Sequence, residues 1–538
     1  MSVVACEEGC SAHSEEVHRS IEMMQAYRST AWGSGDRGYN GSVGWNQSGA
    51  QGYSAWTLVP ALGPGQAPHH EQQCDIPWSA ASVPAAMSTA GLPATPAMQD
   101  EDLLSVFINF ISQFTASLDG KPDASNPYLK HYLPHCLSSR LLTHVAIYSA
   151  ACFLTDTGHI ERTAAMAHKG RVIALLNEHI RAQGQGAASD EVIAGVLQIV
   201  LDEWLWGSAK DLKAHLRGLR DMILSRGGFR SLGLHGLLTK LAITVDAAIA
   251  LSLETPPFLR GGPGFEFRDT TTTSSTPLRL ALNTPLLPNP VRFASCADAL
   301  HIHPSAASIL DDMRFLLAAV LALPDEPTTK ELQKVHTTSA WLYERVSGLP
   351  EDAPGVKGKS GGSLGGWDGK TSGNMQPPPS QQQQQRQHQQ HYQHHQHPPS
   401  PPPTTSNLPP SHSDPIYQTI RLAALLYTHT IQHRLPFSKT VTTTHFLRLW
   451  TTAWRVPLST WRTLLGVFTW VLLPLVSGGG AGAQPQDRFV KGVMNICLFQ
   501  MGLESWAVGG EVVEAGVRLQ RWLAGGGGKD GDVGERGE

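Results

Sequence analysis

The sequence has no excess of basic charge. Its 538 residues carry 41 Lys and Arg against 45 Asp and Glu, which gives a formal net charge of −4. A strong basic excess is typical of chains that bind nucleic acid by themselves, and a Lys/Arg run is the usual nuclear import signal. Because the sequence has neither feature, we expect it neither to bind DNA by charge alone nor to enter the nucleus by a signal of that kind.

The sequence also lacks a long hydrophobic run. Its longest uncharged apolar stretch, residues 463–476, is shorter than the ~20 residues that a membrane-spanning helix requires. We interpret this stretch as a buried core helix and expect no membrane contact. The first twenty residues have no basic segment followed by an apolar core, so a secretory signal is not expected.

Cysteine is scarce and scattered. The seven cysteines are Cys6, Cys10, Cys74, Cys136, Cys152, Cys296 and Cys497. Their number is odd and several lie in apolar helical patterns, which favours buried thiols in a reducing compartment over a disulfide framework.

Glycine and proline, in contrast, are abundant and clustered, with 52 and 37 residues. This composition predicts long disordered parts around a compact one. The expected parts are a disordered N-terminal region at 1–100, a helical domain in two pieces at 101–346 and 414–525, a disordered Pro/Gln/His-rich linker at 347–413, and a disordered tail at 526–538.

The ordered parts show helical periodicity and no two-residue alternation of the kind that strands have. One side of the first helix would contain Leu103, Leu104, Phe107, Ile108 and Ile111. Later helices are expected at 305–323, 328–346, 443–454, 457–475 and 488–523. The fold class predicted is all-α, a stack of antiparallel helical hairpins.

The clearest hairpin lies at residues 210–258. The apolar stripe of its first helix is Leu212, Leu216, Leu219 and Ile223. Gly227 and Gly228 are expected to end this helix, because glycine adopts the left-handed conformation that a helix end needs. The second helix is expected to begin at Leu234 and to end at Pro256 and Pro257.

A basic stripe lies beside the apolar stripe of this hairpin. Lys213, Arg217 and Arg220 could face a phosphate or an acidic partner; the alternative is a solvated helix flank. Arg226 and Arg230, on either side of the glycine turn, are expected to bond helix-end carbonyls.

No other pattern predicts chemistry. Cys6, Cys10, His13 and His18 are nearly contiguous, whereas a zinc finger separates two ligand pairs by a spacer, so a solvated tail is expected. The histidines from His388 to His397 fit a low-complexity linker better than a metal site. Glu203 has no paired carboxylate at a useful spacing. We assign no catalytic, cofactor-binding or metal-binding residue, and an enzyme is not expected.

The hairpin sequence resembles the fungal-specific transcription factor domain, in its second described family. The likeness rests on the pattern HLxGLxxMIxxRGGxxxLGxxGxLxxxLxxxD, which includes here His215, Leu216, Gly218, Leu219, Met222, Arg226, Gly227, Gly228, Leu232, Gly233, Leu237 and Asp246. It extends to the segments before and after, roughly residues 100–525 apart from insertions. The resemblance implies an all-α regulatory domain of a nuclear transcription factor, without established catalytic residues.

Members of this family commonly carry an N-terminal zinc cluster of six cysteines that binds DNA. Only Cys6, Cys10 and Cys74 precede the helical region here. Either the cluster has been lost or the sequence starts downstream of it, and zinc is expected only in the second case. The resemblance then implies protein partners in the transcription machinery and a DNA-binding homologue as a candidate dimer partner, rather than direct DNA contact by this chain. The alternative is a helical scaffold or small-ligand-binding module with no role at DNA.

Overall fold

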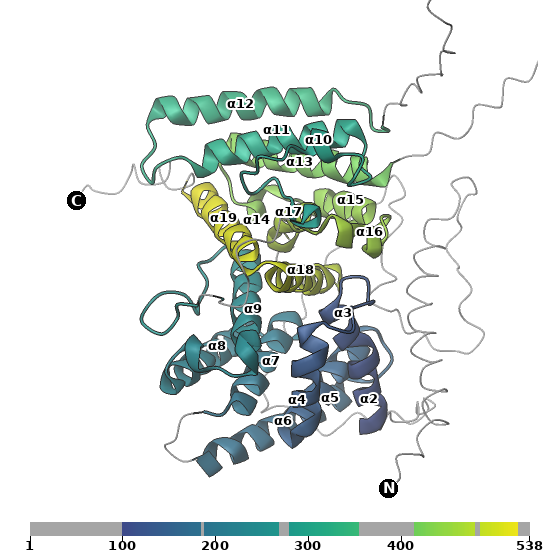
Figure 1. Ribbon diagram of the computed structural model, residues 1–538, viewed down its shortest axis with the longest axis vertical. Coiled ribbons are helices and arrows are strands. Elements are labelled where there is room, and N and C mark those ends of the chain that lie inside the picture. Colours follow the sequence, from purple (N-terminus) through teal and green to yellow (C-terminus); the bar gives the residue numbers. More distant parts are fainter. Residues whose placement is uncertain are drawn as a thin grey trace, which may run out of the picture.

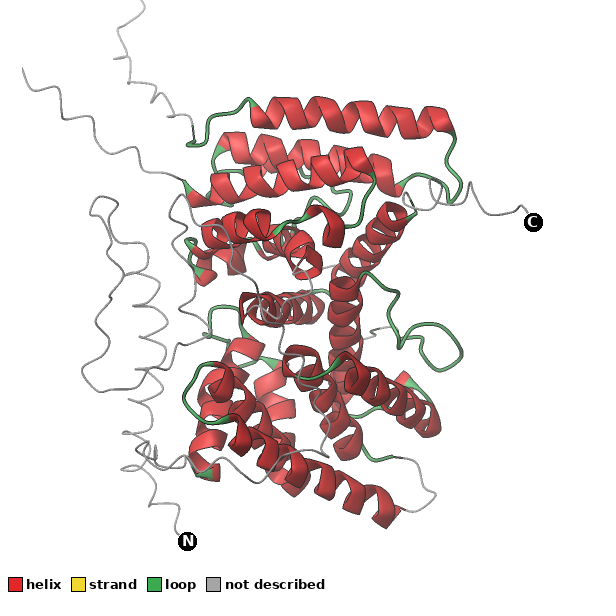
Figure 2. Cartoon of the chain, turned by 180° about the vertical axis from the view of Figure 1, so that it is seen from behind, coloured by secondary structure: helices red, strands yellow, loops and turns green. Residues whose placement is uncertain are grey.

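The computed structural model describes residues 99–183, 188–267, 269, 279–353, 414–478 and 485–525. Every regular element within these ranges is a helix, which confirms the all-α prediction (Figure 2). The stacking of antiparallel hairpins stays a prediction. The expected disorder of most of 1–100, most of 347–413 and all of 526–538 concerns residues outside the described ranges.

The first block of helices extends to residue 253. Its elements are α2 (Asp100–Val106), η1 (Phe107–Ile111), α3 (Ser112–Ala116), η2 (Tyr128–Tyr132), α4 (Leu133–Ser138), α5 (Arg140–Asp156), α6 (Arg162–Gln183), α7 (Asp190–Trp206), α8 (Ala209–Arg226), η3 (Phe229–Ser231), η4 (Leu234–Gly236) and α9 (Leu237–Leu253). Of the short elements, η1 and η2 are π-helical, and η3 and η4 are 3-10 turns.

The second block follows. Its elements are η5 (Leu280–Leu282), α10 (Phe293–Cys296), α11 (Pro304–Leu321), α12 (Thr329–Ser347), α13 (Pro415–His433), α14 (Phe437–Thr440), α15 (Thr443–Trp454), α16 (Leu458–Thr463), α17 (Leu465–Gly478), α18 (Pro485–Glu504) and α19 (Trp506–Ala524).

The last two helices of the described chain, α18 and α19, pack against the first block. In Figure 1, α2–α8 lie at the bottom and α10–α13 at the top, with α18 and α19 between them. α9 packs against α17, α18 and α19, and α18 also packs against α3 and α7. One large hydrophobic core, which extends from Ala116 to Leu523, joins helices of both blocks.

The hairpin of α8 and α9 forms around the glycine turn as predicted. The stripe Leu212, Leu216, Leu219 and Ile223 is buried. Gly227 and Gly228 have φ angles of +103° and +91°, and the Gly228 N–H donates to the Ile223 carbonyl at 2.8 Å. The bond satisfies a carbonyl that the helix end would otherwise leave open.

The predicted limits of the second helix are wrong at both ends. Leu234 and His235 have φ angles of +58° and +55° and form the turn η4, so the helix begins at Leu237. It ends at Leu253, because Glu254 adopts the left-handed conformation two residues before Pro256. In both places a left-handed backbone, which the apolar pattern does not reveal, sets the limit.

The buried face of the first helix differs in part from the prediction. Leu103 and Phe107 are buried as expected, but Ile108 and Ile111 are only half-buried. Phe110, which the prediction left out and which lies three residues after Phe107 in the π turn η1, is buried as well.

Two helices predicted as continuous are each broken once. The 457–475 helix divides at Leu464 into α16 and α17, and the 488–523 helix divides at Ser505 into α18 and α19. The Ser505 hydroxyl caps α19 by accepting from the Val508 N–H, while its own backbone is extended. The apolar period continues across each break and therefore conceals it.

The most apolar helices lie inside the fold. The predicted core run at 463–476 falls mostly in α17, all of whose residues are buried. The stretch Leu234–Leu253 is long and apolar enough to cross a membrane, yet 78% of its apolar window is buried in the interior, as in a core helix. Cys136, Cys152, Cys296 and Cys497 are free and buried, as predicted; Cys6, Cys10 and Cys74 lie outside the described residues.

The first residues of the predicted linker are held against the domain. The Tyr417 hydroxyl donates to the Pro350 carbonyl at 2.8 Å, and Gln418 donates to Asp352 at 3.0 Å. Arg448 pairs with Glu351 at 2.8 Å. The segment 348–353 therefore leads the chain from α12 along α13 and α15.

Candidate ligand cavity and the predicted basic stripe

The predicted basic stripe on α8 is divided by the structure. Lys213 and Arg217 are exposed. Arg220 turns to the segment after α9, where its Nη1 and Nη2 donate to the carbonyls of Phe258 and Gly261 at 2.7 and 2.9 Å. Arg220 thus positions a loop, while the other two cations face solvent.

Two further arginines flank the glycine turn. Arg226 donates to the Ala188 carbonyl at 2.7 Å and pairs with Asp190 at 3.2 Å. It therefore ties the end of α8 to the start of α7, where the Ser189 side chain caps the helix by accepting from the Val192 N–H. Arg230 is exposed.

The residues weighed as metal ligands, Cys6, Cys10, His13, His18 and the histidines from His388 to His397, lie outside the described residues. Within the described ranges, no three or more His, Cys, Asp or Glu side chains are grouped to hold a metal ion.

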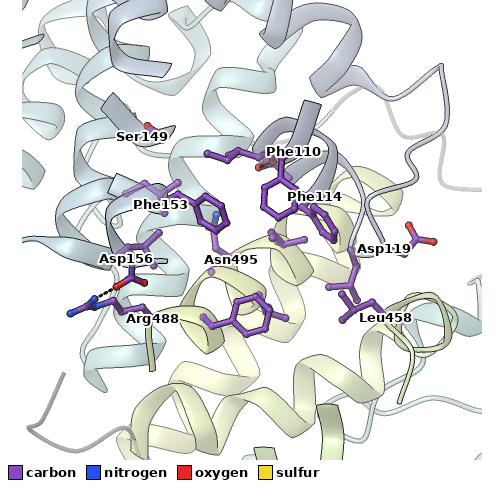
Figure 3. Close-up of a pocket in the computed structure, with 18 of the residues that line it drawn as sticks. Phe110, Phe114, Asp119, Ser149, Phe153, Asp156, Leu458, Arg488 and Asn495 are labelled. Carbon is purple, nitrogen blue, oxygen red and sulfur yellow. Dashed lines mark hydrogen bonds and ion pairs between the residues drawn. The ribbon is translucent and has the colours of Figure 1, made fainter. Parts of the chain in front are cut away.

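A cavity of about 280 Å³ lies where the two blocks meet. Its walls come from η1 and α3, the end of α5, one face of α7, the segment between α15 and α16, and α18. Figure 3 shows Phe110, Phe114 and Phe153 projecting toward one another on one side, with Asn495 near the centre. The aromatic side chains of the lining are Phe110, Phe114, Phe153, Trp206, Trp454 and Phe489.

Helical spacing explains how two of the walls arise. On α7, Gln198, Leu201, Asp202 and Leu205 line the cavity. On α18 the lining residues include Phe489, Gly492, Val493 and Ile496. Spacings of three and four residues place such side chains on one helix face. The π turn η1 delivers Phe110 to the third wall.

Asp202 is the buried acid of the cavity, with 1% of its surface exposed. The Ser149 hydroxyl donates to its Oδ2 at 2.9 Å, and Gln198 Nε2 donates to its Oδ1 at 3.2 Å. Burial raises the pKa of Asp202 to about 7, and the two hydrogen bonds oppose this rise only in part. The carboxyl group therefore exists in both protonation states near neutral pH.

Glu203, the acid next to Asp202 in the sequence, does not line the cavity. Glu203 is buried and forms an ion pair with Lys169 of α6. It needs no ligand to balance its charge. Asp202, by contrast, is held by uncharged donors.

Ion pairs lie at the edges of the cavity. Asp156 at the end of α5 pairs with Arg488 of α18, as the dashed line in Figure 3 marks. Asp119, after α3, pairs with Arg462 of α16 at 3.4 Å. Both pairs join residues more than 300 positions apart, so they hold the first block to the last helices around the cavity.

Two polar atoms of the lining have no hydrogen-bond partner among the described residues. They are Oδ1 of Asn495, a residue with 8% of its surface exposed, and Nε1 of Trp206. Buried polar atoms are nearly always bonded, so an unbonded acceptor and an unbonded donor in one lining point to a missing partner.

Sequence reasoning missed Asp202. The available signal was the acidic pair Asp202 and Glu203 inside the apolar stripe of α7, where charge is rarely buried without a partner. The cavity itself has no signal in the sequence, because its walls come from distant segments.

Residues 102–256 match the family described as "Fungal specific transcription factor domain". No curated protein and no solved structure matches the chain. The match confirms the resemblance that the glycine-turn pattern carries, and proteins with this domain are generally not enzymes.

The fungal specific transcription factor domain provides only part of the cavity. η1, α3, α5 and α7 lie within the matched residues, whereas α15, α16 and α18 lie beyond residue 256. The cavity therefore forms between the domain and the helices that close it.

Proposed function

We propose that this protein regulates transcription by RNA polymerase II, and that it acts in the nucleus through contacts of its helical region with other proteins. The observation that carries the proposal is the fungal specific transcription factor domain at residues 102–256. The proposed partners are proteins of the transcription machinery and a DNA-binding homologue that supplies the contact with DNA.

The outer helices offer a surface suited to such contacts. Phe315 of α11 and Trp341 of α12 expose 65% and 56% of their surface. An ion pair between Asp312 and Arg345 joins the two helices, and Arg345 also lies 5.6 Å from the Trp341 ring. Exposed aromatic residues beside arginine are typical of the centres of protein interfaces.

Chromatin immunoprecipitation of the tagged full chain tests the proposal. We expect enrichment at a defined set of promoters and altered transcription of those genes when the protein is removed. A uniformly cytosolic protein without promoter enrichment would contradict it. The double variant Trp341→Ala with Phe315→Ala should reduce enrichment, while the exposed Lys213→Ala serves as a matched surface control.

A second function, a helical scaffold or small-ligand-binding module without a role at DNA, is favoured by the cavity between the two blocks. Promoter enrichment separates the two functions, since only a regulator needs it.

A further inference from the structure

We propose that the cavity between α3, α5, α7 and α18 binds an apolar amine, with an aromatic or alicyclic body among the aromatic side chains and a charged nitrogen near Asp202. Any effect of such a ligand on transcription rests on the proposed function. Binding to the purified chain does not, so failure of the one can be told from failure of the other.

The size and lining of the cavity set the body of the ligand. A volume of about 280 Å³ lies near the lower end of the ~300–1,000 Å³ that small-molecule sites span. Six aromatic side chains line it. Flat or compact apolar groups fit such walls, because aromatic rings bury large areas and stack at defined distances.

The polar groups of the lining set the head of the ligand. Asp202 offers a carboxylate whose two hydrogen-bond donors, Ser149 and Gln198, are uncharged, and Asn495 offers an oxygen that is buried without a partner among the described residues. Both groups accept hydrogen bonds. Aromatic rings, such as the six that line the cavity, also attract cations. A protonated amine can donate to both oxygens and lie against the aromatic rings, and its body can leave Trp206 Nε1 to a water molecule. A carboxylate would meet the like charge of Asp202; of the two cations in the lining, Lys121 and Arg488, the second is already paired with Asp156.

One glycine keeps part of the cavity open. Gly492 of α18 lines it, and a Cβ atom added there would meet no atom within 4 Å. A leucine at this position would project into free space and fill it. Gly218 of α8 is a matched control, because a Cβ atom there also meets nothing within 4 Å and the residue lies outside the cavity.

Calorimetric titration of the full chain tests the proposal with three probes of one shape: 2-(2-naphthyl)ethylamine, 2-(2-naphthyl)ethanol and 2-naphthylacetate. We expect the amine to bind about 10-fold more tightly than the alcohol, because only the amine forms a charge-assisted bond, and the acid to bind most weakly. Gly492→Leu should abolish binding of the amine and the alcohol, while Gly218→Leu should bind both as the wild type does.

Asp202→Asn isolates the charge. It should lower the affinity for the amine to within about 3-fold of that for the alcohol and leave the alcohol unchanged. Absence of binding by all three probes, or binding that Gly492→Leu leaves intact, would overturn the proposed site. Equal affinity for amine and alcohol in the wild type would overturn the ligand class.

The pH dependence gives a second readout. Asp202 is faced by Lys169 of α6, Glu203 of α7, Tyr148 and Cys152 of α5, and Tyr132 of η2. Since its pKa is raised to about 7, affinity for the amine should increase about 10-fold from pH 5 to pH 8 as the carboxylate forms. The alcohol should show no such increase, and the dependence should vanish in Asp202→Asn.

Discussion

At the scale of single residues, Arg220 shows how one side chain on a basic stripe takes a structural role. Its guanidinium donates to the carbonyls of Phe258 and Gly261 and lies 4.2 Å from the Phe265 ring. We expect Arg220→Ala to lower the free energy of unfolding by about 1–2 kcal/mol, because both bonds and the ring contact are lost.

Chemical denaturation measures this effect, and limited proteolysis of the segment 254–265 reports the loop directly. Lys213→Ala and Arg217→Ala are the controls, since both side chains are exposed and should change stability by less than about 0.5 kcal/mol. Equal effects at the three positions would mean that the stripe acts as a unit. Arg220→Lys should recover only part of the loss, because lysine lacks the paired donors of the guanidinium.

Asp202 should make stability depend on pH. Folding raises its pKa from 3.8 to about 7, so the folded state binds the proton more tightly than the unfolded state. Stability therefore falls as pH rises from about 4 to about 7 and then levels off. In Asp202→Asn this contribution is absent, so the variant should gain roughly 2–3 kcal/mol relative to the wild type between pH 5 and pH 8.

Denaturation curves at several pH values test this prediction. Asp325→Asn, at an exposed position after α11, controls for the change in net charge. Asp246, whose pKa burial raises to about 6, titrates in both proteins and so cancels in the comparison. A stability difference that stays constant with pH would contradict the prediction.

Neither role follows from the sequence, for one physical reason. The partners of Arg220 lie 38 and 41 residues further along the chain, and the Ser149 that holds Asp202 lies 53 residues before it. The sequence predicts that Arg220 and Asp202 lie on helices, but the partner of each side chain depends on how distant segments pack.

At the scale of elements, the glycine turn between α8 and α9 depends on close backbone contact as well as on backbone angle. Gly228 has a φ angle of +91°, and a Cβ atom there would lie 2.5 Å from Gly264 Cα. The Phe229 N–H also donates to the Gly264 carbonyl at 2.8 Å. Gly228→Ala should therefore destabilise the protein by about 2–4 kcal/mol, through steric overlap and strain together.

Thermal and chemical unfolding test this value. Gly218→Ala within α8 is the matched control, because its Cβ atom meets nothing within 4 Å and alanine favours the helix by about 0.5–1 kcal/mol. The two substitutions should thus act in opposite directions. A loss below about 1 kcal/mol at Gly228 would mean that the Gly264 segment can move away at little cost.

Local chemistry decides which elements the sequence could predict. The end of α8 was predictable, because glycine adopts a left-handed backbone at little cost and two consecutive glycines after an apolar stripe favour a helix end. The break at Ser505 was not, because the apolar period continues through α18 and α19 and one serine is a weak signal against it. The π turn η1 has no sequence signature, and it packs against α5, which is distant in the sequence.

At the scale of the whole molecule, the two blocks are joined through α9. The Leu251 carbonyl near its end accepts hydrogen bonds from Ser477 of α17 at 3.1 Å and from Gln520 of α19 at 2.8 Å. Gly516 lets α19 approach α9 closely, because a Cβ atom at this position would lie 3.0 Å from the Leu251 side chain. The last turn of the matched domain is therefore completed by helices some 225 to 270 residues further along the chain.

This arrangement predicts that the pieces on either side of residues 354–413 form one folding unit. The test is a protein cleaved at a protease site introduced within 354–413. We expect it to elute as a single complex and to unfold in one cooperative transition. The reason is that, among the described residues, only α17, α18 and α19 cover one face of α9. The fragment 99–353 expressed alone should expose that face and aggregate or bind a hydrophobic dye.

The same two proteins test the cavity. The fragment 99–353 lacks α18, which forms one wall of the cavity, so it should not bind the amine probe, whereas the cleaved complex should bind it. Two pieces that separate on a sizing column, each helical and each with its own transition, would instead divide the chain into independent domains and would require the probe to bind elsewhere.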